Sequence, residues 1–130
     1  MNKEVFYSRV VPLLEAAASE LSPQVNGVRV VLNSPHPEGY TISAFFDAPR
    51  SNADLLQLNI SFNINDDGEL IYAQVIWGHD SLYVEADYPE QGYAEATSEN
   101  MERLLAEMPR LIGAFKTAVF RGYPEDDPPD

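Results

Sequence analysis

Apolar and polar residues change their spacing twice along this chain, from the period of a helix to that of a strand and back. Near the N-terminus, apolar residues recur every three or four positions, at Phe6, Val10, Leu13, Leu14, Ala17 and Leu21. This spacing predicts one apolar stripe on an amphipathic helix, which Ser22 and Pro23 end. Because Pro12 lacks a backbone N–H, we expect a kink there or a separate short turn before Ser8.

From Val28 onward the apolar residues alternate with polar ones, which predicts strands. The expected strands cover about 28–32, 40–46, 56–64, 70–77 and 82–88. The third is the clearest, because every second residue from Leu56 to Ile64 is large and apolar. One sheet face is therefore buried and the other polar, as in an antiparallel sheet covered on one side. Turns at Asn65–Gly68 and Gly78–Ser81 join the last three strands as hairpins.

A second stripe at helical spacing follows a loop that runs from Pro89 to Ser98. Its members are Met101, Leu104, Leu105, Met108, Leu111, Ile112, Phe115 and Val119. Ser98 is the expected N-cap, and the acidic side chains of Glu99 and Glu102 suit the positive end of a helix dipole. Pro109 interrupts the backbone hydrogen bonding, so we expect a bend or two shorter helices.

The order of helix, five strands and helix predicts an α+β fold. We expect a two-layer sandwich, in which a five-stranded, mostly antiparallel meander sheet carries the N- and C-terminal helices on one face. Residues 1–123 would form this single domain. Residues 124–130 form an acidic, proline-rich tail with nothing to bury, which we expect to be disordered.

The helix-free sheet face is expected to be polar. It would carry the residues that alternate with the apolar ones in the third strand: Gln57, Asn59, Ser61 and Asn63. Glu85 and Asp87 would join them, because their i, i+2 spacing puts both carboxylates on one side of the fifth strand. This face would then be a docking surface.

Charge of one sign is concentrated in the middle of the chain. Between Ser51 and Glu102 there is no lysine or arginine, and this acidic block contains Asp54, Asp66, Asp67, Glu69, Asp80, Glu85, Asp87, Glu90, Glu95, Glu99 and Glu102. The whole chain has a formal net charge of −13. Such a surface repels nucleic acid and anionic lipid, and it attracts a cationic partner over a Debye length of about 8 Å.

Two features of the composition restrict the cellular compartment and the class of protein. The chain has no cysteine, which excludes disulfides and thiolate chemistry and fits a reducing, cytoplasmic compartment. It has no apolar run of about 18 residues, so we expect no membrane span.

The candidate chemical sites have simpler structural readings. Asn63, Asn65, Asp67 and Gly68 match the first half of an EF-hand calcium loop, but Gln74 stands where the bidentate glutamate belongs, so we expect a hairpin turn. Paired carboxylates such as Glu85 and Asp87 can perform acid–base work only when burial separates their pKa values, and nothing nearby indicates burial. We expect no metal and no cofactor.

A histidine beside a carboxylate, as in His79 and Asp80, is what a general base needs. Adjacent residues rarely face one another, however, and the other histidine, His36, lies between two prolines. We therefore expect turn residues that contact solvent or a partner, and no catalytic residue.

Aromatic residues in the acidic block complete the predicted binding surface, because tyrosine and tryptophan beside carboxylates can hold a guanidinium group. The predicted partner-binding residues are Asp66, Asp67, Glu69, Trp77, His79, Asp80, Tyr83, Glu85, Asp87 and Glu90.

A small, cysteine-free, strongly acidic domain with flanking helices and a meander sheet resembles the immunity proteins and antitoxins that bacteria encode beside secreted toxins, including those of contact-dependent and type VI systems. The resemblance implies a protein that is not an enzyme, a monomer or homodimer, whose carboxylates cover the active site of a basic, neighbour-encoded toxin. That active site often binds nucleic acid.

Two other classes stay open. One is a type III secretion chaperone, a dimer that binds a segment of its cargo, although such chaperones usually have a helix between their third and fourth strands. The other is a small hydrolase or ligand-binding domain with a pocket inside the sandwich.

Overall fold

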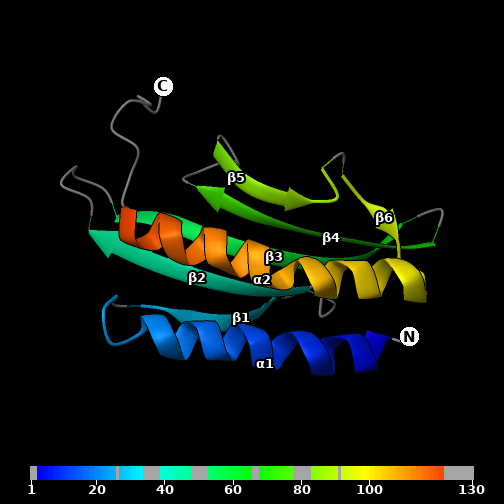
Figure 1. The fold of residues 1–130 in the computed structure, drawn as a ribbon, viewed down its shortest axis with the longest axis horizontal. Helices are drawn as coiled ribbons and strands as arrows, with labels where there is room; N and C mark the ends of the chain where they lie inside the picture. The colour runs from blue at the N-terminus through cyan, green and yellow to red at the C-terminus, as the bar shows by residue number, and fades with distance from the viewer. Residues whose placement is uncertain are drawn as a thin grey trace.

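The structure is a computed structural model, and it describes residues 3–25, 27–33, 39–47, 53–65, 68–77, 83–90 and 92–121 of the 130-residue chain. Its elements are α1 (Lys3–Leu21), β1 (Arg29–Asn33), β2 (Gly39–Asp47), β3 (Ala53–Asn65), β4 (Gly68–Trp77), β5 (Tyr83–Tyr88), β6 (Ala94–Glu95) and α2 (Ser98–Arg121). Two helices and one sheet make two layers (Figure 1), which confirms the predicted α+β sandwich. The predicted tail, 124–130, lies outside the described residues.

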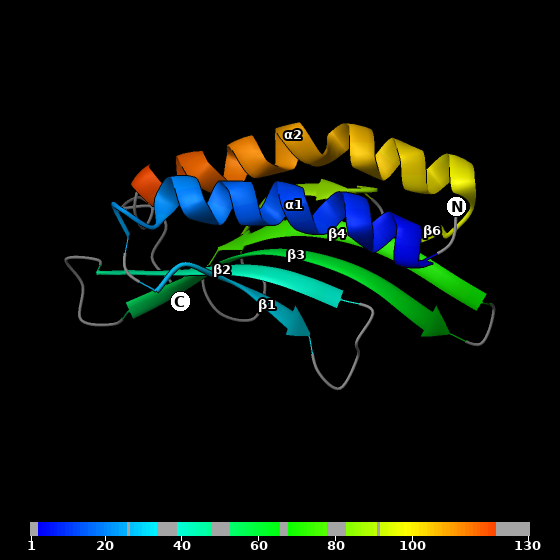
Figure 2. The same cartoon turned by 90° about the horizontal axis from the view of Figure 1, so that it is seen from below.

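The sheet is an antiparallel meander. Strands β1 to β5 lie side by side in chain order, and β6 pairs with the part of β4 that β5 leaves free. Both helices lie on one face of the sheet, and the sheet arches so that its convex side faces them (Figure 2). No helix or strand of the described part of the chain covers the concave side.

Strand β3 shows how the sequence pattern produces these layers. Leu56, Leu58, Ile60 and Phe62 have essentially no exposed surface and face the helices. The matching apolar positions of β2 and β4 lie directly opposite them, such as Ile42 and Val75 on either side of Leu58. At roughly 1.5–3 kcal/mol for each large apolar side chain buried, this row contributes much of the stability.

The apolar stripe of α1 differs by one residue from the predicted one. Leu13 is 39% exposed, whereas Tyr7 is 8% exposed and packs in the core. Tyr7 lies one residue after Phe6 and one turn before Val10, so the buried stripe widens at the start of the helix. In α2 every residue of the predicted stripe is buried.

Both helices continue through their internal prolines. Pro12 lies inside α1 and Pro109 inside α2, so neither helix divides into two. The N-cap of α2 is Thr97, not Ser98, because the Thr97 hydroxyl accepts a hydrogen bond of 3.1 Å from the N–H of Asn100.

The helices run side by side in the same direction (Figure 2), and an ion pair joins them near each end. Arg9 of α1 pairs with Glu102 of α2 at 2.7 Å, and Lys116 of α2 pairs with Glu20 of α1 at 3.1 Å. In both pairs the charge on α2 also suits the nearer end of its helix dipole.

Candidate functional site

Several predicted partner-binding residues lie outside the described residues: Asp66, Asp67, His79 and Asp80. Trp77 and Tyr83 pair with each other where β4 ends and β5 begins. The flanks of the Asn65–Gly68 segment are β3 and β4, which pair up to Asn65 and Gly68, so this connection is the predicted hairpin.

Strand β5 has a bulge at Glu85, which was expected to share a sheet face with Asp87. Asp87 pairs with Gln74, but Ile76 pairs with Val84, so Glu85 is an extra residue in β5. Such a bulge interrupts the two-residue alternation of a strand. The residues of β5 that lie opposite Gln74 and Ile76 are therefore Asp87 and Val84.

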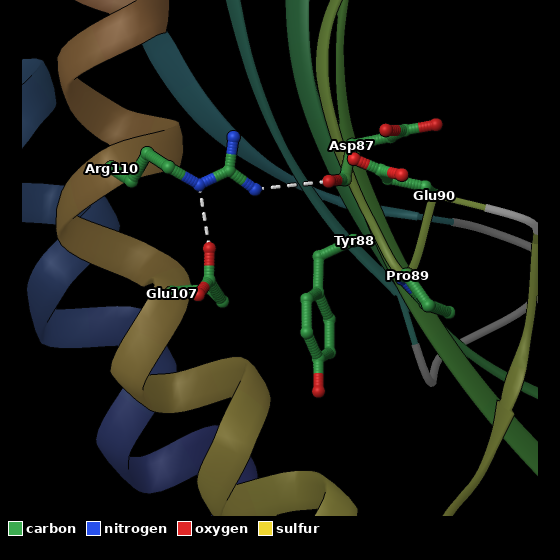
Figure 3. A pocket seen from close by; sticks show the side chains of 6 residues that line it. All are labelled: Asp87, Tyr88, Pro89, Glu90, Glu107 and Arg110. Atoms are coloured by element: carbon green, nitrogen blue, oxygen red, sulfur yellow. Dashed lines mark hydrogen bonds and ion pairs between the residues drawn. The ribbon is translucent and has the colours of Figure 1, made fainter.

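The end of β5 and the middle of α2 form an open groove of about 510 Å³. It is lined by Asp87, Tyr88, Pro89, Glu90, Glu107 and Arg110, which Figure 3 shows together. The Asp87 side chain points away from α2, because Asp87 lies opposite Gln74 on the helix-free face, and its backbone carbonyl faces Arg110. The ring of Tyr88 lies between the strand and α2. Two predicted partner-binding residues, Asp87 and Glu90, thus lie at the strand edge of this groove.

Arg110 is the cation of this groove, and two of its nitrogens make hydrogen bonds within the chain. Its Nε donates to Oε1 of Glu107 at 2.6 Å, and a terminal nitrogen donates to the backbone carbonyl of Asp87 at 3.0 Å. The guanidinium group therefore neutralises Glu107 and ties α2 to β5. Within the described part of the chain, the carboxylates of Asp87 and Glu90 have no ion-pair partner, so the end of β5 beside the groove has an excess of negative charge.

Part of the acidic block is neutralised elsewhere. Glu99 pairs with Arg103 at 3.0 Å, and Glu102 pairs with Arg9, all on the exposed surface of the helices. Glu69 is exposed near the start of β4, away from the groove. The unpaired charge of the described residues is therefore largest on the β5 and β6 side of the sheet.

The helix-free face of the sheet is polar but carries few charges. Its central residues are small or uncharged, and Thr41, Ser43 and Ser61 are each only 6% exposed. The Ser61 hydroxyl donates to the side-chain oxygen of Asn59 at 3.2 Å, so this buried hydroxyl has a hydrogen-bond partner. The predicted polar face is present, but its middle is neutral.

Two tyrosines meet on this helix-free face. Tyr72 lies between Ile71 and Ala73, which are buried against the helices, so its side chain belongs to the opposite face. The ring centroids of Tyr72 and Tyr93 are 4.6 Å apart with an edge-on angle of 78°. Burial raises the pKa of the Tyr93 hydroxyl above its usual value of 10.0, and the charge of Tyr72 and a hydrogen bond with it raise this pKa further.

Some site residues were missed by the sequence analysis. Glu107 and Arg110 come from α2, and their i, i+3 spacing does indicate an ion pair on a helix surface. That α2 would bring this pair to the end of β5 depends on tertiary packing, for which the sequence contains no local signal.

The comparisons with family models, with curated proteins and with solved structures found no match for this chain. Among the described residues, no group of three or more histidine, aspartate or glutamate side chains is arranged to hold a metal ion. The two helices of the described chain are also too polar or too short in their apolar stretches to cross a membrane.

Proposed function

We propose that this chain is an acidic protein-binding module that neutralises a basic protein, as an immunity protein neutralises its toxin. The observation that carries the proposal is the unpaired negative charge at the end of β5, beside α2. The one arginine of the groove is bonded to Glu107 and to the Asp87 carbonyl, while the carboxylates of Asp87 and Glu90 stay unpaired within the described residues. The excess of negative charge at the end of β5 favours a lysine or arginine of a partner.

The charge of the whole chain supports a basic protein as the partner. At a net charge of −13 the chain repels phosphate backbones and anionic lipid headgroups, whereas a basic protein surface is attracted from a distance. Steering of this kind raises association rates and makes them sensitive to salt.

The connection between β3 and β4 counts against a secretion chaperone. Strand β3 ends at Asn65 and β4 begins at Gly68, so the helix that these chaperones usually carry between the two strands has no room. The immunity function therefore accounts better for this fold.

The first test uses the reading frame beside the gene of this chain. We expect its product to inhibit growth when expressed alone, and growth to recover when this chain is co-expressed. The purified pair should associate at least about tenfold more slowly after Asp87→Lys and Glu90→Lys, because both changes reverse the charge at the end of β5.

The matched control is Glu4→Lys with Glu15→Lys. Both residues are exposed on α1, and the pair changes the net charge by the same amount. Equal slowing by both double variants would remove the end of β5 from the interface. A harmless neighbour, or a complex that forms only with an unfolded cargo segment, would overturn the immunity proposal.

A further inference from the structure

The register of the sheet places two carboxylates around the Tyr72–Tyr93 pair. Glu95 lies opposite Leu70, and Asp87 lies opposite Gln74. Leu70 and Gln74 are each two residues from Tyr72 in β4, so they share its face and lie about 7 Å from it along the strand. Glu95 and Asp87 therefore bracket the tyrosine pair, one on each side.

The tyrosine pair is accessible and presents aromatic surface. Tyr93 is 52% exposed although it lies beside a buried part of the sheet. The edge-on contact with Tyr72 fixes the Tyr93 ring and leaves one of its faces uncovered by Tyr72. An exposed ring that a neighbour holds in place loses little freedom when a ligand stacks on it.

No cation of the described residues neutralises this end of the face. The nearest one on the same side of the sheet by register is Arg29, which lies opposite Ser43 in β1. Strand β1 is three strand spacings from β4, or about 14 Å. Among the described residues, the helix-free face thus carries negative charge along β5 and β6 and a cation, Arg29, in β1.

From this arrangement we infer that Tyr72 and Tyr93, with Asp87 and Glu95, form a binding site for an arginine side chain of the partner protein. The inference rests on the proposed function and specifies the partner's chemistry. A guanidinium group is planar and weakly hydrated, so it stacks on the Tyr93 ring while its edge donates to a carboxylate. A lysine ammonium group forms the ion pair but gains less from the ring.

The test compares two synthetic peptides of equal charge, hexa-arginine and hexa-lysine, by isothermal titration and by NMR shifts of the tyrosine rings. We expect the full chain to bind the arginine peptide several-fold more tightly. Tyr93→Leu should abolish this preference, and Tyr93→Phe should retain it because the ring remains.

The matched control is Phe120→Leu, which removes an aromatic ring that is 55% exposed at the end of α2. It should leave the preference for arginine unchanged. Equal affinity for the two peptides, or an equal loss in the Phe120 variant, would overturn the inference.

This test needs no natural partner, so its failure differs from failure of the proposed function. If a toxic neighbour is neutralised but the peptides are not distinguished, the immunity function stands and the arginine site does not. If the peptides are distinguished but the neighbour is harmless, the arginine site stands alone.

Discussion

Phe62 connects the sheet to α1 through two aromatic rings. Its centroid lies 6.0 Å from that of Phe6 and 5.9 Å from that of Tyr7, and the side chain is 1% exposed. Rings at these separations and tilted angles attract each other beyond the area that they bury. The three residues therefore fix how α1 sits on β3.

Replacing Phe62 with alanine should lower the free energy of unfolding by about 3–5 kcal/mol, because it leaves a cavity under α1. Urea denaturation followed by circular dichroism measures this loss. Phe120→Ala removes an equally large ring that is 55% exposed, and should change stability by less than about 1 kcal/mol. Similar losses in the two variants would mean that the Phe62 contacts do not hold α1 in place.

At the scale of residues, the sequence predicted the core better than the polar face. The buried residues of β3 follow from strict alternation, which needs no knowledge of neighbours. The near-complete burial of Ser61 does not follow from alternation, because longer side chains on adjacent strands cover a short one. Likewise, Arg110 could be recognised as a helix-surface cation, but its bond to the Asp87 carbonyl depends on the packing of α2 against β5.

Both helices tolerate an internal proline, which has a measurable cost. Pro109 cannot donate the hydrogen bond that a residue at this position would make to the carbonyl of Leu105, and its ring crowds the preceding turn. Pro109 is exposed, so it contributes little packing in return.

Pro109→Ala should therefore raise the free energy of unfolding by on the order of 1 kcal/mol, less than the full ~3 kcal/mol penalty because the native helix already accommodates the ring. Thermal and urea unfolding measure the change. Thr117→Ala is the control, since it improves helix propensity at another exposed position of α2 by only a few tenths of a kcal/mol. A less stable Pro109 variant would show that this proline is needed where it is.

Among the elements, the long ones were predictable and the irregular ones were not. Helices α1 and α2 and strands β1 to β5 follow from apolar periodicity. The bulge at Glu85 and the two-residue strand β6 depend on which part of β4 is left for pairing. Both irregularities lie beside the candidate site, and they decide which carboxylates lie opposite Gln74 and Leu70.

Across the whole molecule, negative charge repels itself. The net charge of −13 favours expanded states of the chain, and salt weakens this repulsion by screening. The exposed ion pairs between the helices offset this repulsion only slightly, because each exposed pair stabilises the fold by about 0–1 kcal/mol.

Raising NaCl from about 0.02 M to about 0.5 M should therefore increase the melting temperature by a few degrees. Differential scanning calorimetry measures this slope. A variant with Glu90→Gln and Glu95→Gln has two fewer negative charges and should show a smaller slope. A melting temperature that stays constant or falls with salt would show that self-repulsion does not limit the stability of this fold.

The meander order of the sheet has a consequence for synthesis on the ribosome. Each strand from β1 to β5 finds its neighbour in the next segment to emerge, so hairpins can form one after another. The apolar face of those hairpins, however, is covered mainly by α2, whose 24 residues follow every strand in the chain. Until Ser98–Arg121 leaves the exit tunnel, the nascent sheet exposes an apolar, aggregation-prone face that only α1 can cover. A chaperone that binds unfolded chains would matter most during this interval.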